Sequence, residues 1–466
     1  MLMMIADEKQ RSSSARPMLR VAFRVLAVGL FPLALTVTAA PRLVFAETLA
    51  AWVEVVGPSR DASIRVIVSA DSDCPTLTAD GQPLKMRVRA EPGQMFTEGD
   101  LPPPAHFPVR VCEVNAPEGK AKVLLEGNEM PLPRADIQRI IVFGDTGCRI
   151  KKKKKPQDCD DSDKWPYAKV STHAAQAHPD LVIHLGDYLY RESCRLTACE
   201  NARTGYDWEV WNTDFFTPSA PLFAAAPWVM IRGNDENCSR AADGWFRFLD
   251  HAPPDRACPE VSPSFVVDLG SLGFVVMDSA AVSGSDNADS ADDDDDDDEA
   301  GSGQSDNLIE KIRREYAAIA QSIPAPAWLL THSPFNAIRR DKTTGENKVD
   351  NTILQEAVGE VLSPDIAMIV SGHIHIFEAL TFGQTNPQRR PQLVVGTGGD
   401  KLAKKPEKPI VVDGVTVDDA LILKSFGYMV LDRDGANWKG ELFDEGGSPI
   451  AHCRLGGHDL ACEKEQ

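Results

Sequence analysis

Residues 181–190, LVIHLGDYLY, form an apolar run that ends in a cluster of polar residues. Four further segments repeat this arrangement: 140–147 (IIVFGDTG), 228–236 (WVMIRGNDE), 328–334 (WLLTHSP) and 366–375 (IAMIVSGHIH). Short, continuous apolar runs are typical of strands that are buried on both faces. Amphipathic patterns predict helices at 168–178, 308–320 and 353–361. The alternation of strands and helices predicts an α/β fold whose sheets are covered by helices.

The polar clusters carry side chains that suit a metal site. They supply carboxylates, a phenol, an amide and imidazoles, from Asp145, Asp187, Tyr190, Asn234, Asp235, His332, His373 and His375. Loops at the carboxyl ends of strands build the site in α/β folds, and this ligand set suits Fe, Zn or Mn. A single Asp at a strand end is usually a cap or turn residue, and a lone HxH can be two surface histidines. Five clusters in series favour a metal site, and residues at i and i+2 of a strand, such as His373 and His375, would reach it together.

The order GDTG, GDYLY, GND, TH and GHIH resembles the metallophosphoesterase (calcineurin-like phosphoesterase) superfamily, and most of all its purple acid phosphatase branch. The resemblance covers residues 140–398. The wider superfamily has a histidine two residues after the first Asp, where this chain has Gly147. The purple acid phosphatase branch also has glycine there, and it has a tyrosine three residues after the second Asp, where this chain has Tyr190.

The resemblance implies a four-layer αββα sandwich that holds two metal ions, iron together with zinc, manganese or a second iron. Carried over residue by residue, the ligands of the first ion would be Asp145, Asp187, Tyr190 and His375. Those of the second would be Asp187, Asn234, His332 and His373, so that Asp187 bridges the two ions. Two cations about 4 Å apart can hold a hydroxide that attacks phosphorus, and they can bind the phosphoryl oxygens.

Asn234 and Asp235 are the candidate catalytic residues. Relatives usually have a histidine directly after the Asn ligand, where it contacts the phosphate or protonates the leaving group, but here that residue is Asp235. An unperturbed Asp ionises near pH 4. As a general acid it would therefore need acidic conditions or a pKa raised by burial. The alternative is that Asp235 only orients a neighbour by a hydrogen bond, and Glu236 is then a further candidate acid.

The composition divides the chain into three regions. Residues 1–46, with a possible start at Met18, are predicted to be a signal peptide because Arg20 and Arg24 precede an apolar stretch at 25–40. A retained membrane anchor is the alternative, but the stretch is short for a span of about 20 residues. Residues 47–134 alternate short β-rich runs with turn residues and predict a small all-β domain. Residues 135–466 are the predicted catalytic domain, with a disordered acidic insertion at about 283–306.

The ten cysteines all follow the predicted signal peptide. An even count in an exported chain indicates disulfides. Pairing of sequence neighbours is the least entangled arrangement, and it joins Cys74 to Cys112, Cys148 to Cys159, Cys194 to Cys199, Cys238 to Cys258 and Cys453 to Cys462.

The net charge of −20 argues against a general binder of nucleic acids or anionic membranes. Eleven of the acidic residues lie between residues 286 and 306. The basic run at 151–155 is interpreted as a solvated run of charge, with steering of a phosphorylated substrate as the alternative.

The sequence therefore predicts an exported hydrolase that uses two metal ions to cleave small phosphomonoesters. A phosphodiesterase or phospholipase-type hydrolase with the same metals is the first alternative. A non-catalytic, metal-stabilised binding protein is the second. No second hydrophobic span is present, so no stable membrane span is expected, and the sequence gives no indication of an oligomeric state.

Overall fold

The structure, a computed structural model, describes residues 47–96, 105–117, 119, 121–151, 155–194, 199, 202–252, 257–282, 302–340, 344–349, 353–383, 386, 388–412 and 414–465. The predicted signal peptide at 1–46 and residues 283–301 of the predicted insertion lie outside these ranges. Residues 302–306 were predicted to be disordered, but α5 (Ser302–Ile319) begins there. The first six residues of this helix, SGQSDN, contain no apolar side chain, so they lack the apolar pattern that marks a helix in sequence.

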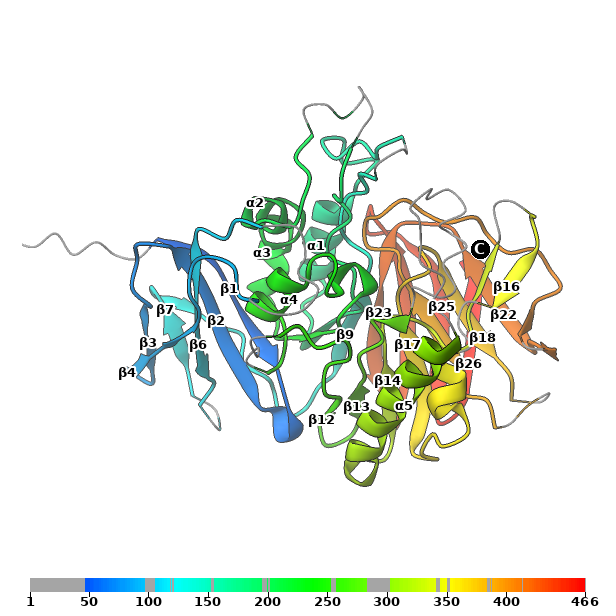
Figure 1. The fold of residues 1–466 in the computed structure, drawn as a ribbon. Helices are drawn as coiled ribbons and strands as arrows, with labels where there is room; N and C mark the ends of the chain where they lie inside the picture. The colour runs from blue at the N-terminus through cyan, green and yellow to red at the C-terminus, as the bar shows by residue number, and fades with distance from the viewer. Residues whose placement is uncertain are drawn as a thin grey trace, which may run out of the picture. The chain divides into compact units, whose positions relative to one another are not determined.

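Two large mixed sheets form the body of the fold (Figure 1). The strands of the first sheet follow the order β26 (Asp459–Lys464), β25 (Pro449–Gly456), β24 (Asn437–Asp444), β23 (Gly427–Asp434), β9 (Arg139–Phe143), β10 (Leu181–His184), β11 (Trp228–Met230), β1 (Thr48–Val55), β2 (Ala62–Ser69), β6 (Val109–Asn115) and β5 (Arg87–Ala90). The second sheet has the order β12 (Phe265–Asp268), β13 (Gly273–Val276), β14 (Ala327–Leu330), β17 (Ile366–Ser371), β19 (Gln392–Val395), β18 (Phe377–Thr381) and β22 (Asp419–Leu423). Parallel strands form the centre of both sheets.

Smaller elements complete the described chain. A four-stranded sheet has the order β4 (Gln82–Lys85), β3 (Thr76–Ala79), β7 (Val123–Leu125) and β8 (Asn128–Glu129). Two hairpins join β15 (Ile338–Arg340) to β16 (Asn347–Val349) and β20 (Val411–Val412) to β21 (Val415–Thr416). The other α-helices are α1 (Tyr167–Gln176), α2 (Trp208–Trp211), α3 (Thr217–Phe223) and α4 (Ala242–Phe248).

The alternating side chains of the central strands pack into different layers. Ile140 and Val142 of β9 lie in a core between the two large sheets. Ile141 and Phe143 point the other way and pack with residues of α1, α3 and α4. Ile312 of α5 packs on the outer face of the second sheet. The continuous apolar runs arise because these strands are covered on both faces, as the α/β prediction required.

As predicted, the described residues of the region 47–134 form β-strands, with one 3-10 turn at Pro58–Arg60. Its strand β1 pairs in parallel with β11 and extends the first sheet, so this region shares that sheet with β9, β10 and β11. Arg65 is fully buried and donates hydrogen bonds to the carbonyl oxygens of Phe248 (2.6 Å), the last residue of α4, and of Asp250 (2.7 Å) just after it. The described residues consequently form one compact unit.

All ten cysteines are paired, and each pair joins the neighbours that the sequence predicted. Three of the bridges begin in the loops that follow β9, β10 and β11, at Cys148, Cys194 and Cys238. Across the described ranges, none of the helices combines the length and the hydrophobicity that crossing a bilayer requires.

Candidate metal centre

The seven predicted metal ligands lie on loops at the carboxyl ends of parallel strands. Asp145 follows β9, Asp187 and Tyr190 follow β10, Asn234 follows β11, His332 follows β14, and His373 and His375 follow β17. Because parallel strands end at the same edge of a sheet, these loops bring residues that are distant in sequence to one place.

Three of these residues have a left-handed backbone conformation. The φ angle is 59° at Asp145, 55° at Asp187 and 69° at His373. This region is uncommon for residues other than glycine, and it clusters at functional sites where the surrounding structure holds it in place. The sharp turns let the side chains leave the strand direction and point into the centre.

The first group of side chains surrounds the hydroxyl of Tyr190. This hydroxyl lies 2.9 Å from Oδ1 of Asp145, 2.8 Å from Oδ2 of Asp187 and 3.1 Å from Nε2 of His375. His375 Nε2 is also 3.2 Å from Asp145 Oδ1. The sequence therefore identified four residues whose polar atoms meet at one point.

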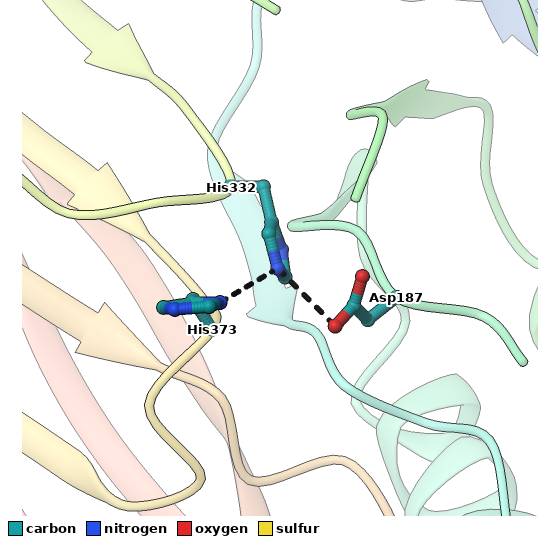
Figure 2. Close-up of side chains that lie close together, drawn as sticks. All are labelled: Asp187, His332 and His373. Atoms are coloured by element: carbon teal, nitrogen blue, oxygen red, sulfur yellow. Dashed lines mark hydrogen bonds and ion pairs between the residues drawn. The ribbon is translucent and has the colours of Figure 1, made fainter. Parts of the chain in front are cut away.

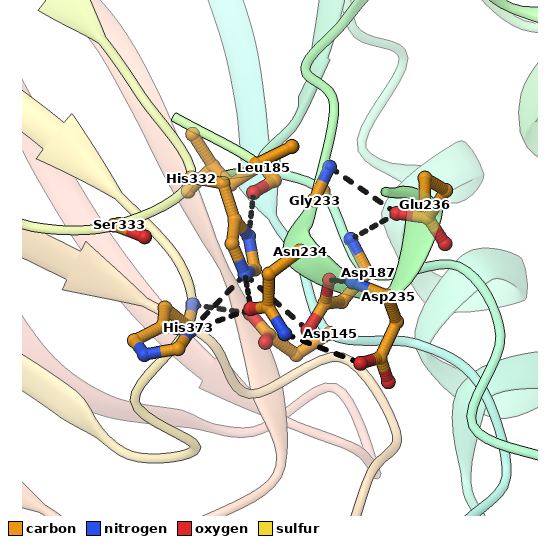
Figure 3. Close-up of polar contacts among 12 residues, drawn as sticks. Asp145, Leu185, Asp187, Gly233, Asn234, Asp235, Glu236, His332, Ser333 and His373 are labelled. Atoms are coloured by element: carbon orange, nitrogen blue, oxygen red, sulfur yellow. Dashed lines mark hydrogen bonds and ion pairs between the residues drawn. The ribbon is translucent and has the colours of Figure 1, made fainter. Parts of the chain in front are cut away.

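The second group is centred on the amide oxygen of Asn234 (Figure 3). Asn234 Oδ1 lies 2.9 Å from Nε2 of His332 and 2.9 Å from Nδ1 of His373. His332 Nε2 is 3.3 Å from Oδ2 of Asp187, and Figure 2 shows this imidazole between Asp187 and His373. Asp187 thus belongs to both groups. It forms one cluster of potential ligands with His332 and His373 and a second with Asp145 and His375. Within each cluster, the ligand atoms lie within 4.8 Å of one another.

The two histidines of the HxH motif contact different groups. The prediction placed them on a strand, but residues 372–376 form the turn between β17 and β18, and the left-handed φ of His373 reverses the chain there. His373 consequently contacts the second group and His375 the first. The predicted strand at these residues was wrong, because they form a turn, but both imidazoles reach the same centre and contact the two groups to which the resemblance assigned them.

The chemistry of the second group fits a cation. Nδ1 of His332 lies 2.7 Å from the carbonyl oxygen of Leu185, which can only accept, so this nitrogen is the donor of the ring. In a neutral imidazole, Nε2 is then a lone pair, and it faces the amide oxygen of Asn234 and the carboxylate of Asp187. When Nε2 is unprotonated, these electron pairs converge in a buried place and would be stabilised by a bound cation; without a cation, a proton on Nε2 takes that place, as the raised pKa of His332 indicates.

The charges in the centre shift the pKa values of its members. Burial raises the pKa of Asp187, but the charge of His332 and hydrogen bonds to the carboxylate have a larger, opposite effect. The net pKa of Asp187 therefore lies well below its usual range. Burial lowers the pKa of His332, whereas Asp187 raises it to about 10. Burial, together with the carboxylates of Asp145 and Asp187, raises the pKa of Tyr190 well above its usual value. The raised pKa values of His332 and Tyr190 report the buried negative charge of the carboxylates, whereas the lowered pKa of Asp187 reports the positive charge of His332 beside it.

Asp235 lies at the edge of the centre. Its backbone N–H donates to Asp187 Oδ1 (2.9 Å), and its carboxylate accepts a hydrogen bond from the Asn234 amide (3.2 Å) and forms an ion pair with Arg240. Burial, with the charge of Asp187, raises the pKa of Asp235 to about 7, although Arg240 acts in the opposite direction.

Glu236, the further candidate acid, contacts the backbone of two neighbouring loops. Its buried carboxylate accepts hydrogen bonds from the backbone N–H groups of Tyr188 (2.9 Å), Asp187 (3.1 Å) and Gly233 (3.2 Å). It therefore ties the loop after β10 to the loop after β11 and is occupied with backbone donors.

Sequence reasoning missed the residues that hold His375. Asp400 Oδ2 lies 3.0 Å from His375 Nδ1, and Arg149 Nε lies 3.0 and 2.9 Å from the two carboxylate oxygens of Asp400. Asp400 ends the glycine-rich segment GTGGD (396–400) after β19, which is the one local signal that marked it. Arg149 begins a basic stretch, and nothing in the sequence around it indicated that it pairs with Asp400.

The basic run at 151–155 is not wholly solvated. Lys151 is 12% exposed and lies 3.1 Å from Glu192, which also contacts Arg240 at 3.5 Å. The interpretation as a solvated run was wrong for Lys151, because the loops after β9 and β10 bring this lysine and Glu192 together. Residues 152–154 lie outside the described ranges.

Comparison with known proteins identifies the family. The model of the calcineurin-like phosphoesterases matches residues 138–377, and the chain belongs to this family, as the motifs predicted. The purple acid phosphatase PPD1 from yellow lupin (Lupinus luteus) seeds has a similar fold, with a TM-score of 0.53, 14% identity, and coverage of 88% of this chain and 73% of that one. PhoD has a TM-score of 0.49 and 12% identity, over 90% of this chain and 92% of that one. A search of curated protein sequences finds no match.

Membership of this family implies a phosphoesterase that works with two metal ions. It leaves open whether the ester is a monoester or a diester, and which metals are used.

Proposed function

We propose that this protein hydrolyses phosphomonoesters at a centre of two metal ions, in the manner of a purple acid phosphatase. The observation that supports this most strongly is the carboxylate of Asp187, which belongs to both clusters of potential ligands. A carboxylate shared by both clusters can bridge two adjacent cations. The choice of monoesters as substrates is supported by the fold similarity to a purple acid phosphatase.

In this proposal, one ion is bound by Asp145, Asp187, Tyr190 and His375. The other is bound by Asp187, Asn234, His332 and His373. When bound, the metal pair supplies a nucleophile at neutral or acidic pH and stabilises the charge that develops on the phosphoryl oxygens. Tyr190 favours ferric iron at the first site because a phenolate is a hard, anionic ligand, with zinc, manganese or iron at the second.

The residues of the chain orient this chemistry. His332 is fixed by the donor bond from its Nδ1 to Leu185, which directs Nε2 towards the second site. The backbone N–H of His373 donates to Asp145 Oδ2 (3.0 Å), which orients the carboxylate of the first site across the centre. These contacts leave few side-chain rotations to be restricted when a substrate binds.

We assign Asn234 and Asp235 to the catalytic edge of the centre, with Asp235 as a positioning residue. Of the two roles considered for Asp235, its contacts with the Asn234 amide and Arg240 support orientation over proton donation. Burial raises the pKa of Asp235 to about 7, which is the condition for proton donation, so the orienting role rests on these contacts and is tested by comparing leaving groups.

We also propose that the protein is exported after cleavage of residues 1–46. Five disulfides support this, because such bonds persist in oxidising compartments. Sequencing the amino terminus of the protein recovered from its native host tests it. A mature chain that still begins before residue 40 would overturn the proposal.

The deciding experiment combines metal analysis with two substrates. The purified protein should contain two metal ions per chain and should hydrolyse a chromogenic phosphomonoester faster than the matching bis-ester. Faster cleavage of the diester would assign the chain to the phosphodiesterase alternative. Two bound metals without cleavage of either ester would favour the binding-protein alternative.

A further inference from the structure

The first metal site is bordered by an arginine–aspartate pair that holds His375. Asp400 is fully buried, its Oδ2 lies 3.0 Å from His375 Nδ1, and its backbone N–H donates to the carbonyl oxygen of Asp145 (2.9 Å). Arg149 spans both oxygens of the Asp400 carboxylate. Because Asp400 fixes Nδ1, the other ring nitrogen is aimed at the hydroxyl of Tyr190 and at Asp145.

The second site is bordered by a pair of the same chemistry, Asp235 and Arg240, and Figure 3 shows Asp235 beside Asn234. Asp235 is buried, with 1% of its surface exposed. Its carboxylate forms an ion pair with Arg240 and accepts a hydrogen bond from Asn234 Nδ2 (3.2 Å). This bond determines which end of the amide faces inward. Asn234 Oδ1 consequently lies 2.9 Å from the nearest nitrogens of His332 and His373.

Both arginines are held by disulfide-bonded loops. Arg149 directly follows Cys148, which is bonded to Cys159, and Arg240 lies two residues after Cys238, which is bonded to Cys258. Each pair thus connects a covalently restrained loop to one ligand that carries no charge of its own, an imidazole or an amide.

Neutral ligands depend on such partners. An asparagine amide that turns over presents its N–H₂ group to the cation, and a histidine ring that rotates loses its alignment. A buried carboxylate polarises and orients the ligand, while the arginine compensates the charge of that carboxylate, which would otherwise be costly to bury.

We propose that two separate arginine–aspartate pairs position the two metal sites, Arg149–Asp400 the first through His375 and Arg240–Asp235 the second through Asn234. This inference rests on the proposed dinuclear centre. It assigns to these four residues a role in metal affinity at one site each, and it predicts that the two sites can be weakened independently.

The test measures the two sites separately. Metal-free protein is titrated with Zn²⁺ by calorimetry, and ferric protein is examined for the visible absorption of an iron-bound Tyr190. Asp400→Asn should weaken one Zn²⁺ site by about 10- to 100-fold and shift or abolish the visible band. Asp235→Asn should weaken the other site by a similar factor and leave the band in place.

Two variants of partly exposed residues control for misfolding of the aspartate variants. The side chains of Arg149 and Arg240 are 18% and 27% exposed, so Arg149→Gln and Arg240→Gln disturb the core less and should reproduce the same site-specific losses. Asp243→Asn is the matched control, because Asp243 forms a buried pair with Arg247 within α4 and contacts none of the proposed ligands. It should leave both affinities and the band unchanged.

The outcomes separate this inference from the proposed function. Equal weakening of both sites by either pair, or unchanged affinities in all four variants, would overturn the inference while wild-type protein still binds two metals and cleaves esters. Site-specific losses in a wild-type protein that binds two metals but cleaves no ester would support the inference and overturn the proposed function. Wild-type protein that binds fewer than two metals would overturn both.

Discussion

Gly147 determines how closely the loop after β10 approaches the loop after β9. A Cβ atom at this position would lie 2.6 Å from the carbonyl oxygen of Tyr188, and 2.9 Å from both Leu189 Cα and Tyr190 N. All three are backbone atoms, which cannot rotate away as a side chain can. We therefore predict that Gly147→Ala displaces the backbone that carries Tyr190.

The size of the displacement follows from these contacts. Ordinary van der Waals contact of a Cβ atom begins near 3.4 Å, so the carbonyl oxygen of Tyr188 must retreat by about 0.8 Å. Metal–ligand distances tolerate deviations of only about 0.2 Å. Tyr190 should consequently leave the first site, and the overpacking should lower the free energy of unfolding by about 1–3 kcal/mol.

The assay compares Gly147→Ala with Gly383→Ala, because a Cβ at Gly383 meets no atom within 4 Å. Thermal unfolding, metal content and visible absorption are measured on all three proteins. Gly147→Ala should unfold at a lower temperature, lose the band of iron-bound Tyr190 and bind the first metal more weakly, whereas the control should match the wild type. A Gly147→Ala protein with wild-type stability, metal content and absorption would refute the steric argument.

Three further predictions concern single ligands and Asp235. Asp187→Asn removes the carboxylate shared by both clusters, so metal analysis should find a loss at both sites and hydrolysis close to background; two retained metals with normal turnover would contradict this. Tyr190→Phe should abolish the visible band of the ferric protein, and a band that persists would assign it to another group. Asp235→Asn should slow esters with good and poor leaving groups by the same factor, because its contacts indicate positioning; a selective effect on poor leaving groups would restore the general-acid role.

The sequence determined the fold class, the family and the residues of the centre. Each depended on a local pattern: apolar runs reveal strands covered on both faces, and GD, GND, TH and GHIH follow those strands directly. The disulfides were also predictable, since the paired cysteines are sequence neighbours, which the structure confirms.

Tertiary structure decided how these side chains are aimed and what supports them. The separation of His373 and His375 depends on a left-handed turn, which no strand pattern contains. Asp400 meets Arg149 across 251 positions of sequence, and Glu236 meets Tyr188 across 48, so neither contact leaves a local signal. The joining of the all-β region to the first sheet likewise depends on β1 pairing with β11, far along the chain. Local patterns report what a residue's immediate neighbours require, whereas contacts between distant segments are fixed only when the sheets pack and bring the strand ends together.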